Sequence, residues 1–145
     1  MPYHTYHNYG YGLCLDDIVI DSVDRIRMLL DKAPCLKKEV EDWFKECEIT
    51  EPTLKDYEDF DQDSGMGFAY LFREVVLERE KIELLACRDF DDRTYVMYEI
   101  CYPWYMTRKE KRLTPTKLDK IFNKYLKILT DQPYKLGDVE SENGG

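Results

Sequence analysis

The 145-residue sequence lacks the patterns that identify common enzymes, metal proteins and membrane proteins. The five cysteines form no C-x-x-C pair, which excludes a zinc ribbon and a thioredoxin-type redox motif. Gly10 and Gly12 lack the residues that complete a phosphate-binding loop. No apolar run approaches the roughly 18 residues of a membrane span, and the N-terminus has no secretory pattern. We therefore expect a cytoplasmic protein with reduced thiols and no cofactor.

An EF-hand is also missing, although residues 58–67, EDFDQDSGMG, have the composition of a calcium loop. An EF-hand needs glycine at loop position 6 and glutamate at position 12. A loop that starts at Asp59 has Ser64 and Tyr70 at these positions, and the register that starts four residues later puts a glycine where a ligand belongs. An irregular, weak cation site remains open at Asp59, Asp61 and Asp63.

What the sequence has in abundance is negative charge in one segment. The net charge is −9 at pH 7. Residues 39–63 contain eleven acidic and two basic side chains, so this segment alone carries −9. Residues 108–127 contain eight basic and two acidic side chains and carry +6. Such a distribution selects partners by the sign of their charge. Whether the two segments pair with each other cannot be read from the sequence.

The apolar pattern predicts one α+β domain over residues 1–145, with helices packed on a small antiparallel sheet. Residues 3–15 and 134–139 are typical of strands, and Gly10 and Gly12 indicate a bend. Residues 82–102 predict a β-hairpin, and residues 140–145 a frayed tail. Helices are expected after Ser22, from Pro34, from Pro52 to about Phe60, from Phe68 with Ser64 as a candidate cap, and after Thr114. For the run from Phe68 to Val76 a strand is the alternative, because the run ends in β-branched residues.

The acidic segment is the main candidate site. Glu39, Asp42 and Glu46 recur three and four residues apart, which places them on one face of a helix. A scaffold with so many carboxylates imitates a nucleic acid in charge and fits a basic cleft. The alternative is a solvated surface that only keeps the protein soluble. The candidate partner-binding residues are Glu39, Asp42, Glu46, Glu48, Glu51, Asp56, Glu58, Asp59, Asp61 and Asp63.

A second hypothesis is a small enzyme or metal-binding protein that uses His4, His7 and Cys14. Several points disfavour it. In an extended segment the H-x-x-H spacing sends the two imidazoles to opposite faces. Two histidines also leave a zinc site incomplete, and a cysteine–histidine pair needs an orienting group that no motif indicates. We therefore expect a protein that is not an enzyme and assign no catalytic or metal-binding residue.

Two further hypotheses concern other surfaces. The tyrosine-rich N-terminus is typical of an exposed sheet edge, which favours an oligomerising or structural interaction protein. The basic segment 108–127, with Tyr102, Trp104 and Tyr105 nearby, has the composition of a nucleic-acid contact. A pI near 4.8 disfavours this last interpretation, because phosphates repel a strongly acidic chain.

Short sequence patterns at both ends of the chain resemble those of other small proteins. The patterns are Tyr-Pro-Trp at 102–104, Leu-Thr-Pro at 113–115, Tyr-Leu-Lys-Ile-Leu at 125–129, Tyr-Gly-Tyr-Gly at 9–12 and the terminal Glu-Asn-Gly-Gly. They resemble small uncharacterised proteins of Gram-positive bacteria and their phages and mobile elements, and leave the acidic middle unmatched. In size and charge the chain also resembles anti-CRISPR inhibitors. The resemblance implies an inhibitor of a nucleic-acid-handling protein, such as a defence nuclease, and transfers no catalytic residues.

Overall fold

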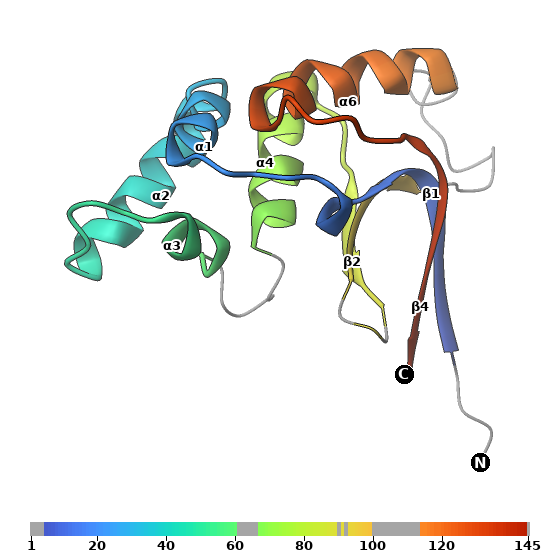
Figure 1. Cartoon of the computed structure of the whole chain (residues 1–145), viewed down its shortest axis with the longest axis horizontal. Coiled ribbons are helices and arrows are strands. Elements are labelled where there is room, and N and C mark those ends of the chain that lie inside the picture. The colour runs from blue at the N-terminus through green and yellow to red at the C-terminus, as the bar shows by residue number, and fades with distance from the viewer. Residues whose placement is uncertain (1–4, 61–66, 90, 92, 100–113, 145) are drawn as a thin grey trace.

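A computed structural model of the protein describes residues 5–60, 67–89, 91, 93–99 and 114–144. These residues form five α-helices and a four-stranded antiparallel sheet, which confirms the predicted α+β class (Figure 1). One continuous cluster of buried apolar side chains joins the helices to the sheet. The strands are β1 (Thr5–Cys14), β2 (Leu85–Arg88), β3 (Thr94–Glu99) and β4 (Gly137–Gly144).

The sheet has the strand order β2-β3-β1-β4, so β1 is a central strand that pairs with β3 and β4. Two glycines in β1 allow the β3 backbone to come very close. A Cβ atom on Gly12 would lie 2.0 Å from the carbonyl oxygen of Val96, and one on Gly10 would lie 2.3 Å from that of Tyr98. Figure 1 shows β1 curving, and the outer strands β2 and β4 approach each other. The sheet is therefore strongly curled, and glycine is required where it bends.

The helices begin where local capping chemistry starts them. Ser22 accepts a hydrogen bond from the Asp24 amide and Thr114 accepts one from the Lys117 amide, as their positions in the sequence predict. The short third helix begins after Thr53, whose capping box places the start two residues beyond Pro52. The helices are α1 (Val23–Leu30), α2 (Pro34–Glu46), α3 (Leu54–Glu58), α4 (Phe68–Glu80) and α6 (Pro115–Leu129), and a 3-10 turn spans Leu15–Asp17.

Helix α4 is the centre of the molecule. It lies between α1 to α3 on one side and the sheet on the other (Figure 1). Ala69, Phe72 and Val76 are completely buried, and Phe72 stacks on Phe122 of α6 with ring centroids 5.8 Å apart. A helix buried on more than one side needs apolar residues around most of its circumference. This explains why its apolar run also has the composition of a buried strand.

Three sequence predictions need correction. Residues 140–144, predicted as a frayed tail, belong to β4 and pair with residues 5–9 of β1. Backbone pairing to β1 explains the strand, because these residues have no apolar pattern of their own. The cap of α4 is Gly67 and not Ser64. The hairpin is formed by residues 85–99, although Ile82 and Leu84 before it are buried. Residues 100–102 lie outside the described residues.

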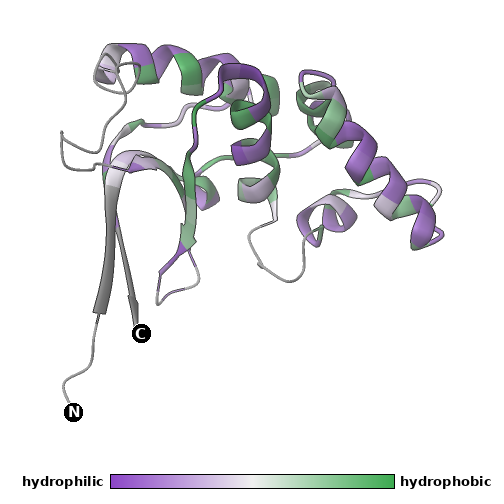
Figure 2. Cartoon of the chain, turned by 180° about the vertical axis from the view of Figure 1, so that it is seen from behind, coloured by the Kyte–Doolittle hydropathy of each residue, from purple (hydrophilic) through white to green (hydrophobic). Residues whose placement is uncertain are grey.

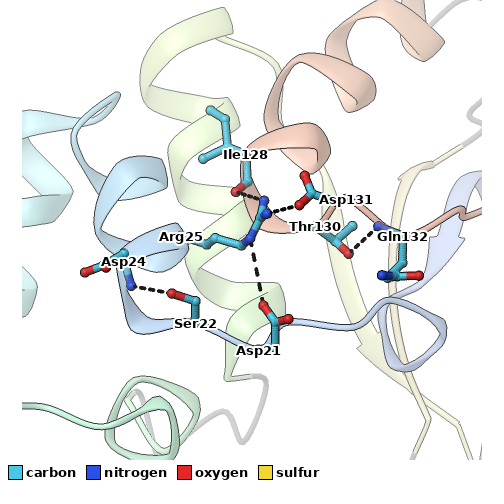
Figure 3. A network of polar contacts seen from close by, with 8 residues as sticks. All are labelled: Asp21, Ser22, Asp24, Arg25, Ile128, Thr130, Asp131 and Gln132. Carbon is cyan, nitrogen blue, oxygen red and sulfur yellow. Dashed lines mark hydrogen bonds and ion pairs between the residues drawn. The ribbon is translucent and has the colours of Figure 1, made fainter.

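An arginine joins α1 to the end of α6 (Figure 3). The Arg25 guanidinium donates to the carbonyl oxygen of Ile128 at 3.3 Å and forms an ion pair with Asp131. It also lies 3.8 Å from Asp21, which precedes the cap of α1. The last carbonyl groups of a helix have no partner within it. Arg25 therefore satisfies one of them while it fixes the contact between the two helices.

Hydroxyl groups of three tyrosines tie α6 to its surroundings. Tyr125 donates to Glu80 at the end of α4, Tyr11 of β1 donates to Asp119, and Tyr134 donates to Asn123. Lys124 adds a 3.3 Å contact to the same Glu80 carboxylate. The polar groups of α6 thus hold the sheet, α4 and the segment before β4 together.

Candidate functional site

The acidic segment, as far as the structure describes it, is residues 39–60. It contains nine acidic and two basic side chains, a net charge of −7. Helix α2 buries a stripe of Leu36, Val40 and Phe44 against the core. Glu39, Asp42 and Glu46 lie away from this stripe and are exposed, as their spacing predicts. Figure 2 shows the long hydrophilic stretches of α2 on this side of the molecule.

Aromatic contacts hold α3 against α2. Trp43 meets Phe60 edge to face with ring centroids 5.2 Å apart, and Phe44 meets Tyr57 in the same way at 5.0 Å. Such pairs add about 0.5–1.5 kcal/mol to the burial of the rings. The acidic side chains of α3 are therefore held close to those of α2 by a rigid contact.

The structure separates the predicted binding residues into three groups. Asp56 has a structural role, because its carboxylate accepts hydrogen bonds from the backbone amide and hydroxyl of Thr53 at 2.8 and 3.1 Å. Asp61 and Asp63 lie outside the described residues. They are two of the three residues of the weak cation site that the sequence left as an alternative. The remaining residues are all exposed; they are Glu39, Asp42, Glu46, Glu48, Glu51, Glu58 and Asp59.

The fold leaves most of this charge without a partner. Within residues 39–60, the ion pairs among the described residues are limited to one, between Asp42 and Lys38 at 3.3 Å. No described ion pair joins this segment to residues 114–127 of the basic region, where Lys124 pairs with Glu80 instead. Figures 1 and 2 show α6 extending from α1 over the sheet, away from α2 and α3. The described parts of the two charged segments therefore do not neutralise each other.

A groove lies beside the acidic segment, between α1, α2 and the segment that leads into α3. Its volume is about 730 Å³, and it is open to solvent. The floor is apolar and partly aromatic, and the rim is charged. The floor is formed by Leu30, Val40, Phe44, Ile49 and Tyr57. The rim is formed by Arg27, Asp31, Lys37, Glu41, Lys45 and Glu48, with Thr50 and Pro52 at one side.

Two of the three cations on the rim are engaged within the protein. Lys37 lies 2.7 Å from Asp31, and this hydrogen bond is the main reason that the pKa of Lys37 is raised. Arg27 lies 4.0 Å from Asp24, and its pKa is raised, mainly by the neighbouring Tyr57 hydroxyl. By contrast, Glu41 and Glu48 form no hydrogen bond or ion pair with other described residues. The rim thus offers carboxylates to a ligand more readily than it offers cations.

A smaller groove of about 390 Å³ separates α2 from α4 and includes Glu39, Glu74 and Glu78. Glu78 has a structural role, because its carboxylate accepts hydrogen bonds from the backbone amides of Cys35 and Leu36 at 3.2 and 3.0 Å. It caps the first turn of α2, because the N-cap residue Ala33 has no side-chain oxygen that could accept these hydrogen bonds. Among the described residues, no group of three or more His, Cys, Asp or Glu side chains is arranged to hold a metal ion.

Of the residues of the enzyme or metal hypothesis, the two that the structure describes lie far apart. His4 lies outside the described residues. His7 pairs with Glu142 near one end of β1, and Cys14 ends the same strand. A seven-residue separation along a strand is on the order of 20 Å. Burial raises the pKa of the Cys14 thiol, which disfavours the nucleophilic thiolate.

Comparisons with known proteins add no assignment. No protein-family model matches the chain, and neither a curated protein nor a solved structure matches it. Within the part of the chain that the structure describes, no helix combines the length and apolar character needed to cross a membrane. The surface chemistry of α1 to α3 is therefore the main indication of function.

Sequence reasoning missed the groove. Val40 and Phe44 have the spacing of ordinary core residues and are 0% and 4% exposed, so nothing in the sequence distinguishes the floor of a groove from the core. Ile49 and Tyr57 complete the floor from a loop and a short helix whose placement depends on tertiary contacts. The one available signal was the mixed charge at 37, 41, 45 and 48 along one flank of a predicted helix, which is also typical of a solvated surface.

Proposed function

We propose that the protein is a non-enzymatic binding domain that engages a basic surface of another protein through its acidic segment. The observation that carries the proposal is the exposed charge of residues 39–60, which the described ion pairs leave almost uncompensated. Unpaired carboxylates on packed helices repel one another and do little for folding. A basic partner removes this repulsion when it binds.

The partner that best fits this chemistry is a nucleic-acid-handling protein. Its basic cleft is built to bind a row of phosphates, and the acidic segment offers a row of carboxylates on a scaffold already folded. Occupation of the cleft would block the natural substrate. In this proposal the chain acts as an inhibitor of the kind that phages and mobile elements use against defence nucleases.

A capture experiment with three forms of the protein tests the proposal. Wild type, a Glu39→Gln, Asp42→Asn, Glu46→Gln variant and a matched control are immobilised and exposed to nuclease-treated bacterial lysate supplemented with purified defence nucleases. The control, Glu83→Gln, Asp91→Asn, Glu99→Gln, removes three exposed charges from the sheet side. Captured proteins are identified by mass spectrometry and challenged with double-stranded DNA.

We expect wild type and the control to capture the same basic nucleic-acid-binding protein, and DNA to displace it. The acidic-segment variant should capture about tenfold less, because charge complementarity accelerates association. Capture should also decline steeply between low and moderate salt, as screening shortens the range of these charges. Equal capture by all three forms, or loss in both variants alike, would contradict a site in the acidic segment.

A further inference from the structure

We infer that the groove between α1, α2 and α3 receives an apolar side chain from a basic segment of the partner. This inference rests on the proposed function and adds a point of specificity to it. Charge alone attracts many cationic proteins, whereas a shaped apolar pocket selects among them. The occupant is thus a protein segment in which a large apolar residue is flanked by lysine or arginine.

The shape and floor of the groove support a side-chain anchor. A volume of about 730 Å³ lies in the range of ordinary ligand pockets, which is roughly 300–1,000 Å³. The floor is apolar, with Phe44 and Tyr57 adding aromatic surface. Peptide segments that dock in such grooves bury apolar anchors and leave charged residues at the edge.

The charge around the groove determines the sign of the flanking residues. Lys37 is paired with Asp31 at 2.7 Å, and Arg27 lies 4.0 Å from Asp24, so both cations face a carboxylate of the protein itself. Glu41 and Glu48 on the rim form no hydrogen bond or ion pair with other described residues, although Glu41 contributes to the raised pKa of Lys37, and the acidic segment around them carries −7. A cationic segment is therefore attracted to the rim and an anionic one is repelled.

The remaining cation does not convert the rim into an anion site. Lys45 lies one helical turn after Glu41 in α2, and Glu48 follows the C-terminal end of this helix; all three residues line the groove. An anion placed there would meet one lysine and two carboxylates. A cationic segment placed there would be attracted by the two carboxylates and repelled by only one lysine.

Two synthetic peptides of equal charge separate the groove from simple electrostatic attraction. The first is an amphipathic 14-residue peptide of leucine and lysine, and the second replaces each leucine with serine. A third peptide keeps the leucines and replaces each lysine with glutamate. Binding is measured by fluorescence anisotropy at low and moderate salt, and methyl NMR of Leu30, Val40 and Ile49 locates the contact.

The test variant is Thr50→Trp, which places a large side chain at the exposed margin of the groove without changing the charge. Val19→Trp is the matched control, because Val19 is 54% exposed and does not line the groove. A second variant, Ile49→Ser, makes the floor polar and is used if the tryptophan variant does not fold. Thermal unfolding of each variant verifies the fold.

We expect the leucine–lysine peptide to bind wild type and Val19→Trp at least about tenfold more tightly than the serine–lysine peptide, with shifts in the methyl signals of all three residues. Thr50→Trp or Ile49→Ser should remove this advantage and leave the serine–lysine affinity unchanged. Equal affinity of both cationic peptides for wild type would overturn the groove inference and leave the proposed function standing. Failure of both cationic peptides to bind at low salt would overturn the proposed function too. Tighter binding of the glutamate peptide would overturn the assigned charge.

Discussion

Helices α2 and α6 are both amphipathic, but they use their polar residues in different ways. Side chains of α6 contact other elements through Tyr125 and Lys124 at Glu80 and through Asp119 at Tyr11. The exposed acids of α2 contact almost nothing: Asp42 pairs with Lys38 in its own helix, and Glu39 and Glu46 have no described ion pair. Polar groups on α6 thus serve the fold, and those on α2 are free to serve a partner.

The difference shows which charged residues are informative about function. A carboxylate that accepts hydrogen bonds from distant elements, as Glu80 and Glu78 do, is explained by stability. A row of exposed carboxylates that raises self-repulsion has no such explanation. We therefore expect substitutions at the contacts of α6 and the sheet to reduce stability, and substitutions on the exposed face of α2 to reduce binding alone.

The largest loss of stability is expected from Gly12→Ala in the curled part of β1. The new Cβ would meet backbone atoms of β3, the nearest at 2.0 Å, and backbone cannot move aside as a side-chain end does. The free energy of unfolding should decrease by about 3 kcal/mol or more, measured by urea denaturation. Gly137→Ala is the control, because no atom lies within 4 Å of its Cβ position. Equal losses in the two variants would show that the close approach of β1 and β3 is not as described.

Removal of the Tyr125 hydroxyl should have the next largest effect. Burial and the hydrogen bond to Glu80 raise the pKa of this tyrosine to about 12. Tyr125→Phe removes this donor from Glu80 while the Lys124 contact stays in place, and we expect a loss of about 1.5–3 kcal/mol, the range for hydrogen bonds to charged groups. Lys120→Met, an exposed change on the same helix, should have little effect in the same urea experiment.

The pH dependence of that loss follows from the raised pKa. A group whose pKa is raised on folding contributes fully below its unfolded value, here 10.0, and loses the contribution as the pH rises through the folded value of about 12. The difference in stability between wild type and Tyr125→Phe should therefore shrink between pH 10 and pH 12. A difference that stays constant over this window would contradict the contact with Glu80.

A smaller loss is expected from Glu78→Gln, which weakens the cap of α2. The carboxylate accepts hydrogen bonds from two backbone amides of the first turn. Its negative charge also interacts favourably with the positive end of the helix dipole there. The amide retains one acceptor oxygen but no charge, so we expect a loss of about 0.5–1 kcal/mol. Glu83→Gln is an exposed control of the same chemistry. The midpoints of thermal unfolding are compared for the two variants. Identical midpoints would show that the Glu78 cap does not stabilise α2.

The sequence was sufficient for much of the fold, since local signals determine it. Ser22, Pro34 and Thr114 mark helix starts, and the structure confirms each. Features that depend on distant residues could not be predicted. The cap of α2 comes from Glu78, forty-two residues beyond Leu36, and residues 140–144 become a strand only because β1 is beside them.

The candidate site was predictable only in part for the same reason. Periodicity places Glu39, Asp42 and Glu46 on one exposed face, as observed. Asp56 is engaged in a capping box with Thr53. The spacing of three residues between them is a local signal for this box, which the prediction of a helix start at Pro52 overlooked. The groove depends on how α1 and α3 meet α2, which no local pattern encodes.

The central claim is that the exposed acids of α2 serve binding and not folding. Glu39→Gln, Asp42→Asn, Glu46→Gln tests it most directly when its unfolding free energy and its affinity for the leucine–lysine peptide are measured together. We expect stability within about 0.5 kcal/mol of wild type and an affinity reduced about tenfold at low salt, mostly through the association rate. A stability loss of more than about 1 kcal/mol with unchanged affinity would contradict the claim, because these carboxylates would then belong to the fold.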